Sequence, residues 1–395
     1  MTKRPLRIIR LNKAILLPSD YSDGSDLFVK KLTAVLAALL LATACLPARA
    51  VDTHASCAIL MDAESGRVLY EQNIHQPRLI ASITKLLTAL VAVEQGLDLD
   101  QVVTVRGEWL GSEGSSIYLK AGEEITLRGL LYGLLLQSGN DAAMVIACHI
   151  AGSEAEFVAL MNEKAAELGM KDSSFANPSG LDHEDHYSTP YDMALLARAC
   201  LKNETVAEIC ATGSITIGTR TFVNHNKLLR RYEGCVGMKT GFTEKAGRTL
   251  VSAATRDGQT LICVTLNDGD DWNDHRKLLD YGFQTYPRQV LCRDGEVTGA
   301  VAVEGSLIPT MPVVTQAELG YPLKEGEKPV QEVELLPSAS APLPPGVQLG
   351  KIRWRLGGEV IAEMPLVSPS GAGLDVREPL SFWERIRVLL GGQSA

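Results

Sequence analysis

The sequence predicts a mixed α/β (α+β) fold in which a β-sheet is combined with a layer of helices, followed by a small all-β domain. Three observations predict this arrangement. Two strand–turn–strand patterns stand far apart in the chain, helical patterns fill the stretch between them, and near Pro287 the sequence changes to short strands with frequent glycine and proline. With 395 residues, 46% of them hydrophobic, the chain can form one large core and a smaller companion domain.

Residues 1–50 have the composition of an N-terminal extension and a secretory signal peptide. Lys30 and Lys31 precede an apolar run over 32–46, and Ala48-Arg49-Ala50 forms a small-x-small cleavage site. We therefore expect the protein to be exported from the cytoplasm.

Three alternatives for this region stay open. A transmembrane anchor is the weaker interpretation, because the apolar run of 15 residues is shorter than the roughly 20 that span a bilayer. A lipoprotein anchor at Cys45 is disfavoured, since Ala42 stands where leucine would be expected. The residues before the two lysines are unusual for a signal peptide, so Leu27 or Val29 is a hypothetical alternative start of translation.

Strand patterns begin and end the first domain, for which we expect residues 51–287. The segment "CAILMDAESGRVLY" predicts two strands around a turn at 63–66, and "GRTLVSAATRDGQTLICVTL" repeats the pattern around Asp257-Gly258. Helical periodicity with flanking Gly, Asn, Ser or Pro predicts five helices between the hairpins and one after them. Their expected ranges are 82–95, 126–136, 141–151, 154–168, 190–201 and 272–283.

The remainder of the chain predicts a second domain and a tail. Short strands such as "GAVAVEGSLIP" and "GVQLGKIRWRLGGEVIAEMPLV" predict a small β-domain over 288–367. In 368–395 the linker "SPSGAG" precedes "LSFWERIRVLLGG", where apolar residues alternate with charges. This tail predicts a helix that either lies on a membrane surface or packs on the domain.

Charge and cysteine content exclude several kinds of partner and chemistry. A formal net charge of −9 argues against a nucleic-acid partner, which usually requires a basic surface. Seven cysteines follow residue 50, without CxxC pairs or zinc-finger spacing, so no disulfide framework is evident. Cys148, Cys200 and Cys263 lie in apolar periodic segments and are expected to be small buried hydrophobes, and no cysteine nucleophile is predicted.

Three short motifs carry the chemistry. Ser82 and Lys85 are three residues apart in the apolar stretch "IASITKLLTAL", so on a helix they share one face. Alone, Ser-x-x-Lys is expected about once by chance in a chain of this length, and the lysine would be expected to extend to water. Ser138-Gly139-Asn140 and Lys239-Thr240-Gly241 follow in this order, and the ordered set of three is a strong signal.

With these motifs the sequence resembles the active-site serine penicillin-recognising enzymes, specifically the low-molecular-mass penicillin-binding proteins that are D-alanyl-D-alanine carboxypeptidases. The resemblance covers about 55–285 and includes "IYLKAGEEITLRGLLYGLLLQSGNDAA", "FANPSGLDHEDHYSTPYDMALLA", "HNKLL" and "GMKTGFTEKAGRTLVSAA". It implies a β-lactamase/transpeptidase-like catalytic domain followed by a small β-domain and a C-terminal membrane anchor.

The resemblance and the demands of acyl transfer together assign three catalytic residues. Ser82 would be the nucleophile, and Lys85 would accept its proton. That role requires burial and the nearby cation of Lys239 to keep the Lys85 amine neutral, against an ordinary pKa of about 10.4. Ser138 would relay the proton to the leaving amine.

The remaining site residues are assigned to substrate binding. Asn140 would contact the substrate backbone or Lys85, while Lys239 and the Thr240 hydroxyl would bind the terminal carboxylate. Gly241 would let the strand approach the substrate, and the backbone amides of Ser82 and Phe242 would stabilise the oxyanion. For Arg248, either a contact to the carboxylate or a surface salt bridge is expected.

The predicted function is a serine-type D-Ala-D-Ala carboxypeptidase that removes the terminal D-alanine from peptidoglycan pentapeptide stems through an acyl-enzyme and is acylated by penicillin. It would act at the extracytoplasmic face of the bacterial membrane or in the cell wall, without a cofactor. Alternatives are an endopeptidase for crosslinks, a non-catalytic envelope scaffold, and a β-lactamase. The β-lactamase is disfavoured because Gly139 stands where class A β-lactamases have Asp and no Glu-x-x-Leu-Asn segment is present.

No metal site is assigned. His183 and His186 in "DHEDH" lack a third ligand, and this segment is expected to be a solvated loop that caps the next helix. The acidic segment "NDGDDWNDH" lacks the closing glutamate of an EF-hand and predicts a turn before a helix. His149 is expected to be an ordinary core or surface histidine.

Overall fold

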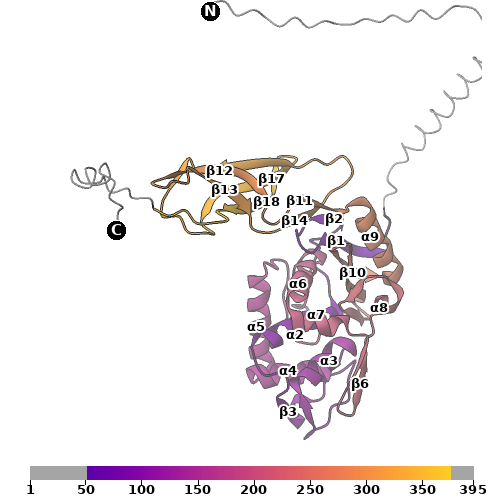
Figure 1. Cartoon of the computed structure of the whole chain (residues 1–395). Coiled ribbons are helices and arrows are strands. Elements are labelled where there is room, and N and C mark those ends of the chain that lie inside the picture. Colours follow the sequence, from indigo (N-terminus) through magenta and orange to yellow (C-terminus); the bar gives the residue numbers. More distant parts are fainter. Residues whose placement is uncertain (1–50, 375–395) are drawn as a thin grey trace, which may run out of the picture. The chain divides into compact units, whose positions relative to one another are not determined.

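The computed structural model describes residues 51–374, which contain an antiparallel sheet, a group of helices and a series of short C-terminal strands (Figure 1). The predicted signal peptide and the amphipathic tail lie outside the described residues. The first part of the chain contains β1 (Ala55–Asp62), β2 (Val68–Gln72), η1 (Ala81–Thr84), α2 (Lys85–Glu94), β3 (Val102–Thr104), η2 (Gly107–Trp109), β4 (Glu124–Thr126), α3 (Leu127–Leu136), α4 (Asn140–Ala151), α5 (Glu154–Glu167), α6 (Pro190–Lys202) and α7 (Glu204–Ala211).

The chain then returns to the sheet. The elements are β5 (Ser214–Ile217), β6 (Arg220–Val223), α8 (Leu228–Arg231), β7 (Cys235–Gly237), β8 (Thr240–Thr243), β9 (Gly247–Arg256), β10 (Gln259–Asp268) and α9 (Asp271–Thr285). The sheet has the order β2-β1-β10-β9-β7, and β8 also pairs with β9, so its first and last strands in sequence are neighbours. Both predicted hairpins are confirmed, the second with Arg256 opposite Gln259.

Alternation along the strands places a separate core on each face of this sheet. In β1, Cys57, Ile59 and Met61 face the core that contains α2, whereas Ala58 and Leu60 face α9. The helices α2 to α7 gather beyond one face, and α9 lies against the other (Figure 1). The apolar run that reads as almost continuous in sequence is therefore a strand buried on both sides.

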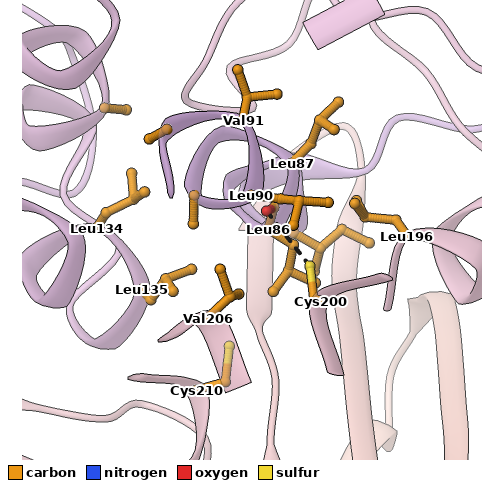
Figure 2. Packing of buried hydrophobic residues seen from close by; sticks show 14 of the residues in the cluster. Leu86, Leu87, Leu90, Val91, Leu134, Leu135, Leu196, Cys200, Val206 and Cys210 are labelled. Atoms are coloured by element: carbon orange, nitrogen blue, oxygen red, sulfur yellow. Dashed lines mark hydrogen bonds between the residues drawn. The ribbon is translucent and has the colours of Figure 1, made fainter. Parts of the chain in front are cut away.

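The helix α2 is enclosed by other helices. Figure 2 shows Leu86, Leu87, Leu90 and Val91 of α2 surrounded by side chains of α3, α6 and α7. Every residue from Lys85 to Ala92 is buried. This explains why the sequence there shows hydrophobic residues in all directions, and it leaves no part of Lys85 exposed to solvent.

Most predicted helix ranges are confirmed to within two residues, and caps account for their ends. Thr126, Ser153 and Thr189 each accept a hydrogen bond from the backbone N–H three residues on, at the starts of α3, α5 and α6. The exception is the helix expected from Ser82, because α2 begins at Lys85. The sequence patterns did not predict α7, α8 and two short strand pairs, β3 with β4 and β5 with β6.

The C-terminal strands form two sheets and have their own core. They are β11 (Arg288–Cys292), β12 (Val297–Glu304), β13 (Thr310–Thr315), β14 (Leu319–Pro322), β15 (Val330–Leu335), β16 (Ser338–Ser340), β17 (Gln348–Leu356) and β18 (Glu359–Val367). One sheet is six-stranded with the order β15-β17-β18-β13-β12-β16, and the other is a two-stranded sheet of β11 with β14. In β17, Ile352 and Trp354 point into the core, whereas Arg353 and Arg355 pair with glutamates on neighbouring strands.

The seven cysteines in residues 51–374 are free thiols. Cys200 and Cys263 are fully buried as expected, but the expectation for Cys148 was wrong, because it is only half-buried beside the sulfur of Met144. Within the described part of the chain no single helix is long and apolar enough to span a membrane, and α4 with α5 meets those requirements only jointly, across an 88° bend.

Candidate active site

Ser82 lies in the short 3-10 turn η1 that leads into α2, not in the α-helix itself. The turn departs from helical geometry because Ala81 has a positive φ of 51°. Two contacts hold this strained backbone: the Thr84 hydroxyl donates to the Ala81 carbonyl at 2.8 Å, and Gly180 packs directly against that carbonyl. A Cβ at Gly180 would lie 2.0 Å from the Ala81 oxygen, so only glycine fits there.

Lys85 is completely buried, and its side-chain nitrogen Nζ contacts three polar atoms. Nζ lies 2.9 Å from Ser82 Oγ, 2.7 Å from Asn140 Oδ1 and 2.5 Å from the Ser179 carbonyl. A neutral amine has two N–H donors and one lone pair. The Asn140 and Ser179 oxygens can only accept, so they take both N–H groups of a neutral amine, and its lone pair then faces the Ser82 hydroxyl, which can donate as well as accept.

The electrostatic surroundings favour the neutral amine. Burial, followed by the charge of Lys239, holds the pKa of Lys85 well below its usual range. Asp141 opposes this shift, yet within residues 51–374 Lys85 forms no ion pair. Lys239 is also buried, and burial lowers its pKa to about 7.

Ser138 and Asn140 come from the junction between α3 and α4, as the sequence predicted. Ser138 is 6% exposed and has a positive φ of 61°, and within the described residues its hydroxyl has no hydrogen-bond partner. Asn140 is the first residue of α4, and its Nδ2 donates to the Glu113 carbonyl at 2.5 Å. This second bond orients the amide so that its oxygen faces Lys85.

Asp141 supports the site but was not identified from the sequence. Its buried carboxylate accepts hydrogen bonds from the Ser116 hydroxyl at 2.6 Å and from the backbone amides of Ile117 and Leu119 at 3.0 Å. It thereby ties the 113–119 loop to the start of α4. The position directly after the Ser-x-Asn motif was the available signal, since an acidic residue is favoured in the first turn of a helix.

The third motif, Lys239-Thr240-Gly241, lies where β7 ends and β8 begins, and both of these strands pair with β9 at the edge of the sheet. Lys239 pairs with Val251 through two backbone hydrogen bonds of 3.0 and 2.9 Å, and the preceding Met238 has a φ of 85°. Gly241 approaches the turn η1 that contains Ser82: a Cβ there would lie 2.9 Å from the Ser82 nitrogen and 2.4 Å from Thr249 Oγ1. The glycine therefore lets the strand approach Ser82 itself, in addition to the approach to substrate that the sequence suggested.

The other predicted residues follow along β8. Lys239 Nζ donates to the Thr240 carbonyl at 2.8 Å and forms no ion pair within residues 51–374. Thr240 is half-buried, whereas the Phe242 side chain is 64% exposed. Arg248 Nη2 forms two 2.8 Å hydrogen bonds to the Asp271 carboxylate, so the salt bridge, one of its two expected contacts, is present.

The expectation that "DHEDH" forms a solvated loop was wrong for His186, which is 1% exposed and contacts Thr84, two residues after Ser82. Its Nδ1 accepts from the Ala176 amide, so the proton sits on Nε2, 2.7 Å from Thr84 Oγ1, whose own proton goes to the Ala81 carbonyl. Burial, with the nearby His183 and Lys85, lowers the pKa of His186 to about 4. His186 is thus a neutral support of the turn η1, and Thr189 caps α6 as predicted.

A separate group of possible ligand atoms lies at the start of α9. His54, Asp270 and Asp274 place one ligand atom each within 4.8 Å of the others. The Asp274 oxygens already accept from the His54 amide at 2.5 Å and from Lys277 Nζ at 2.8 Å. These donors compete with a cation for the same lone pairs.

Comparisons with known proteins agree on one family. The family model described as D-alanyl-D-alanine carboxypeptidase matches residues 44–270, and the model described as penicillin-binding protein 5, C-terminal domain, matches 286–371. The chain is 33% identical over 330 residues to the D-alanyl-D-alanine carboxypeptidase DacF of Bacillus subtilis, which covers 80% of this chain and 85% of the relative. It is 38% identical over 251 residues to DacB2 of Mycobacterium tuberculosis, covering 60% and 85% respectively.

Solved structures give the same result. Penicillin-binding protein 5 from Haemophilus influenzae is 28% identical with a TM-score of 0.70, over 82% of this chain and 98% of that one. The peptidoglycan synthesis regulatory factor PBP3 from Streptococcus pneumoniae is 27% identical with a TM-score of 0.73, over 81% and 100%. Because each similarity covers more than four fifths of this chain, both include the first sheet and extend into the C-terminal strands.

Proposed function

The chain belongs to the D-alanyl-D-alanine carboxypeptidase family of low-molecular-mass penicillin-binding proteins, and from this premise we propose how its residues carry out the reaction. The protein is a serine-type D-Ala-D-Ala carboxypeptidase. Its substrates are peptidoglycan stem peptides, and β-lactams are its inhibitors. The observation that carries the residue assignment is the buried Lys85, which has no acidic partner in 51–374 and lies 2.9 Å from Ser82 Oγ.

Acylation begins when the neutral Lys85 amine takes the proton of the Ser82 hydroxyl. Ser82 Oγ attacks the carbonyl carbon of the penultimate D-alanine, and the electron pair of the carbonyl moves to its oxygen. The backbone amides of Ser82 and Phe242 donate to that oxyanion, and the close approach of Gly241 to the Ser82 nitrogen supports this pairing. The intermediate collapses with cleavage of the C–N bond, and the proton passes from Lys85 through Ser138 to the leaving D-alanine amine.

Deacylation returns the enzyme to its starting state. A water molecule attacks the ester on Ser82 while Lys85 accepts one of its protons. The C–O bond to Ser82 breaks, Lys85 returns the proton to Ser82 Oγ, and the shortened stem leaves as a carboxylic acid. The same ester formed with penicillin is the expected long-lived adduct.

The terminal carboxylate of the substrate binds at the beginning of β8. Lys239 is a buried amine that forms no ion pair within the described chain, so an incoming carboxylate supplies the counter-charge it lacks. The Thr240 hydroxyl adds a hydrogen bond, and Arg248 is assigned no part in binding this carboxylate because its Nη2 already pairs with Asp271. Binding of the carboxylate raises the pKa of Lys239, because an adjacent negative charge favours the protonated amine.

Intact mass after incubation with benzylpenicillin tests the assignment. The wild type should gain the mass of one penicillin, the Ser82→Ala variant should gain none, and Ser338→Ala in β16 should behave as the wild type. Equal labelling of wild type and Ser82→Ala, or no labelling of either, would contradict the assignment.

The proposed function also indicates the cellular location of the protein, because its substrate is peptidoglycan. It acts on peptidoglycan in the periplasm or cell wall, and we propose that 1–50 directs its export, 51–287 catalyses the reaction, and 288–367 forms a separate β-domain. The tail at 368–395 is proposed to bind the membrane surface. N-terminal sequencing of the mature protein should begin at Val51, and removal of 375–395 should release the protein from the membrane fraction; a mature protein beginning at Met1, or unchanged fractionation, would contradict these two proposals.

A further inference from the structure

A pocket of about 400 Å³ opens just beyond the end of β8 and has no part in the steps above. It is lined by Leu79, Asp182, His183, Glu184 and Lys245. Its walls come from the segment before the turn η1, from the loop before α6, and from the turn between β8 and β9.

The pocket shares these walls with the active site. Asp182 Oδ1 accepts a hydrogen bond of 2.8 Å from Thr243 Oγ1, which joins the loop to the last residue of β8. Two and three residues earlier, the same loop places Gly180 against the Ala81 carbonyl and the Ser179 carbonyl against Lys85. A substrate held along β8 therefore passes the mouth of the pocket.

The pocket is lined by acidic and basic side chains, and two of them can bind a ligand because they have no partner within the described residues. Glu184 and Lys245 are exposed, and within residues 51–374 neither forms an ion pair or a hydrogen bond through its side chain. The other two polar residues are already engaged. Asp182 accepts from Thr243, and His183 Nδ1 accepts from the Asp185 amide at 3.1 Å.

The direction of the substrate along β8 determines which part of it reaches the pocket. The terminal carboxylate lies at Lys239 and Thr240, and the scissile carbonyl lies at the Phe242 amide. The stem residues before the scissile bond therefore extend past Thr243. At about 3.3 Å per extended residue, the third stem residue falls opposite the Thr243–Lys245 segment.

We propose that this pocket is a subsite for the charged side-chain end of the third stem residue, an inference that rests on the proposed function. That residue is a diamino acid in peptidoglycan. Glu184 binds its side-chain ammonium group, and Lys245 binds the side-chain carboxylate where the diamino acid carries one. The pocket thus favours a zwitterionic end of the diaminopimelate type.

Three pentapeptide substrates that differ only at the third residue test the proposal: meso-diaminopimelate, L-lysine and the uncharged L-norleucine. Glu184→Gln should lower kcat/KM about three- to fivefold for the first two and leave norleucine unchanged. Lys245→Met should lower it by a similar factor for diaminopimelate alone. Glu325→Gln and Lys328→Met, exposed residues of the β-domain, are matched controls and should change none of the three.

Equal effects of Glu184→Gln and Lys245→Met on all three substrates, or no effect on any, would overturn the subsite. The benzylpenicillin adduct on Ser82 distinguishes this failure from a failure of the proposed function. A wild type that forms the adduct and hydrolyses all three pentapeptides without such discrimination refutes the subsite alone. A wild type that forms no adduct and hydrolyses nothing refutes the proposed function and the subsite with it.

Discussion

The replacement Asn140→Asp tests whether Lys85 acts as the neutral base. The substitution keeps the shape of the side chain but turns the acceptor 2.7 Å from Lys85 Nζ into a carboxylate. At that separation and an effective dielectric constant of about 20, Coulomb's law gives about 6 kcal/mol in favour of the ammonium form. If local relaxation halves this energy, the acid limb of the acylation rate moves up by about two pH units.

The direction in which the acid limb moves follows from the proposed role of the Lys85 amine. Only neutral Lys85 can accept the Ser82 proton, so a higher pKa leaves less active enzyme at neutral pH, and the rate recovers as the pH rises. We expect acylation by benzylpenicillin to fall by up to about 100-fold on the acid side of the shifted limb and to approach the wild-type rate in alkaline solution.

The measurement is the acylation rate between about pH 5 and about pH 10. Asn140→Ala is the matched control, because it removes the same contact to Lys85 without adding a charge. Both variants lose the hydrogen bond to the Glu113 carbonyl, so both should lose about 1–2 kcal/mol of unfolding free energy, but only Asn140→Asp should move the acid limb upward. An acid limb unchanged by Asn140→Asp would refute the role of Lys85.

Three further predictions concern the supports of the site. Gly180→Ala should lower the unfolding free energy by about 3 kcal/mol and abolish penicillin binding, whereas Gly122→Ala, also at positive φ but with open space around it, should cost about 1 kcal/mol and leave binding intact; equal losses in urea unfolding would contradict this. His186 has a folded pKa of about 4 against its ordinary 6.5, so its neutral form contributes stability that is present above pH 6.5 and lost as the pH falls toward 4, up to about 3 kcal/mol. His186→Gln should flatten that part of the stability curve, and an unchanged slope would refute this account. Arg248→Gln should destabilise the fold by about 2–3 kcal/mol by leaving the buried Asp271 unpaired, yet leave KM for a D-Ala-D-Ala peptide within about twofold; a large rise in KM would place Arg248 at the substrate carboxylate after all.

The sequence predicted the elements whose signals are local. The caps at Thr126, Ser153 and Thr189 mark helix starts in the sequence, and the structure confirms all three helices. The placement of Ser138-Gly139-Asn140 between two helices could also be predicted, because both neighbouring helices have strong periodic patterns. By contrast, α7 was not predicted as a separate helix, because its eight residues follow α6 after a single capping residue, Asn203.

The parts that could not be predicted depend on contacts between distant segments. Ser82 was expected in the helix because its stretch is apolar and periodic, but Gly180 and Thr249 hold the preceding backbone in a strained turn. His186 looked like a loop residue beside other polar residues, and only the fold reveals that it lies under Thr84. Neither contact has a signal within a window of ten residues.

Of the seven non-glycine residues with positive φ in residues 51–374, three lie at the motifs. Ala81 precedes Ser82, Ser138 begins the second motif, and Met238 precedes Lys239. Such conformations cost about 1–3 kcal/mol each and persist only where surrounding contacts fix them.

The fixing contacts are those that sequence analysis missed. Gly180 and Thr84 hold the Ala81 carbonyl, Asp141 ties down the loop beside Asn140, and the Asn226 side chain donates to the Gly237 carbonyl at 2.8 Å before Met238. A strained backbone and a buried amine both need a rigid, dry surrounding. The strained backbone would otherwise relax to a common conformation, and the amine would otherwise be hydrated. The apolar enclosure of α2 meets that requirement, which explains how Lys85, the proposed base, can stand in one of the most hydrophobic stretches of the chain.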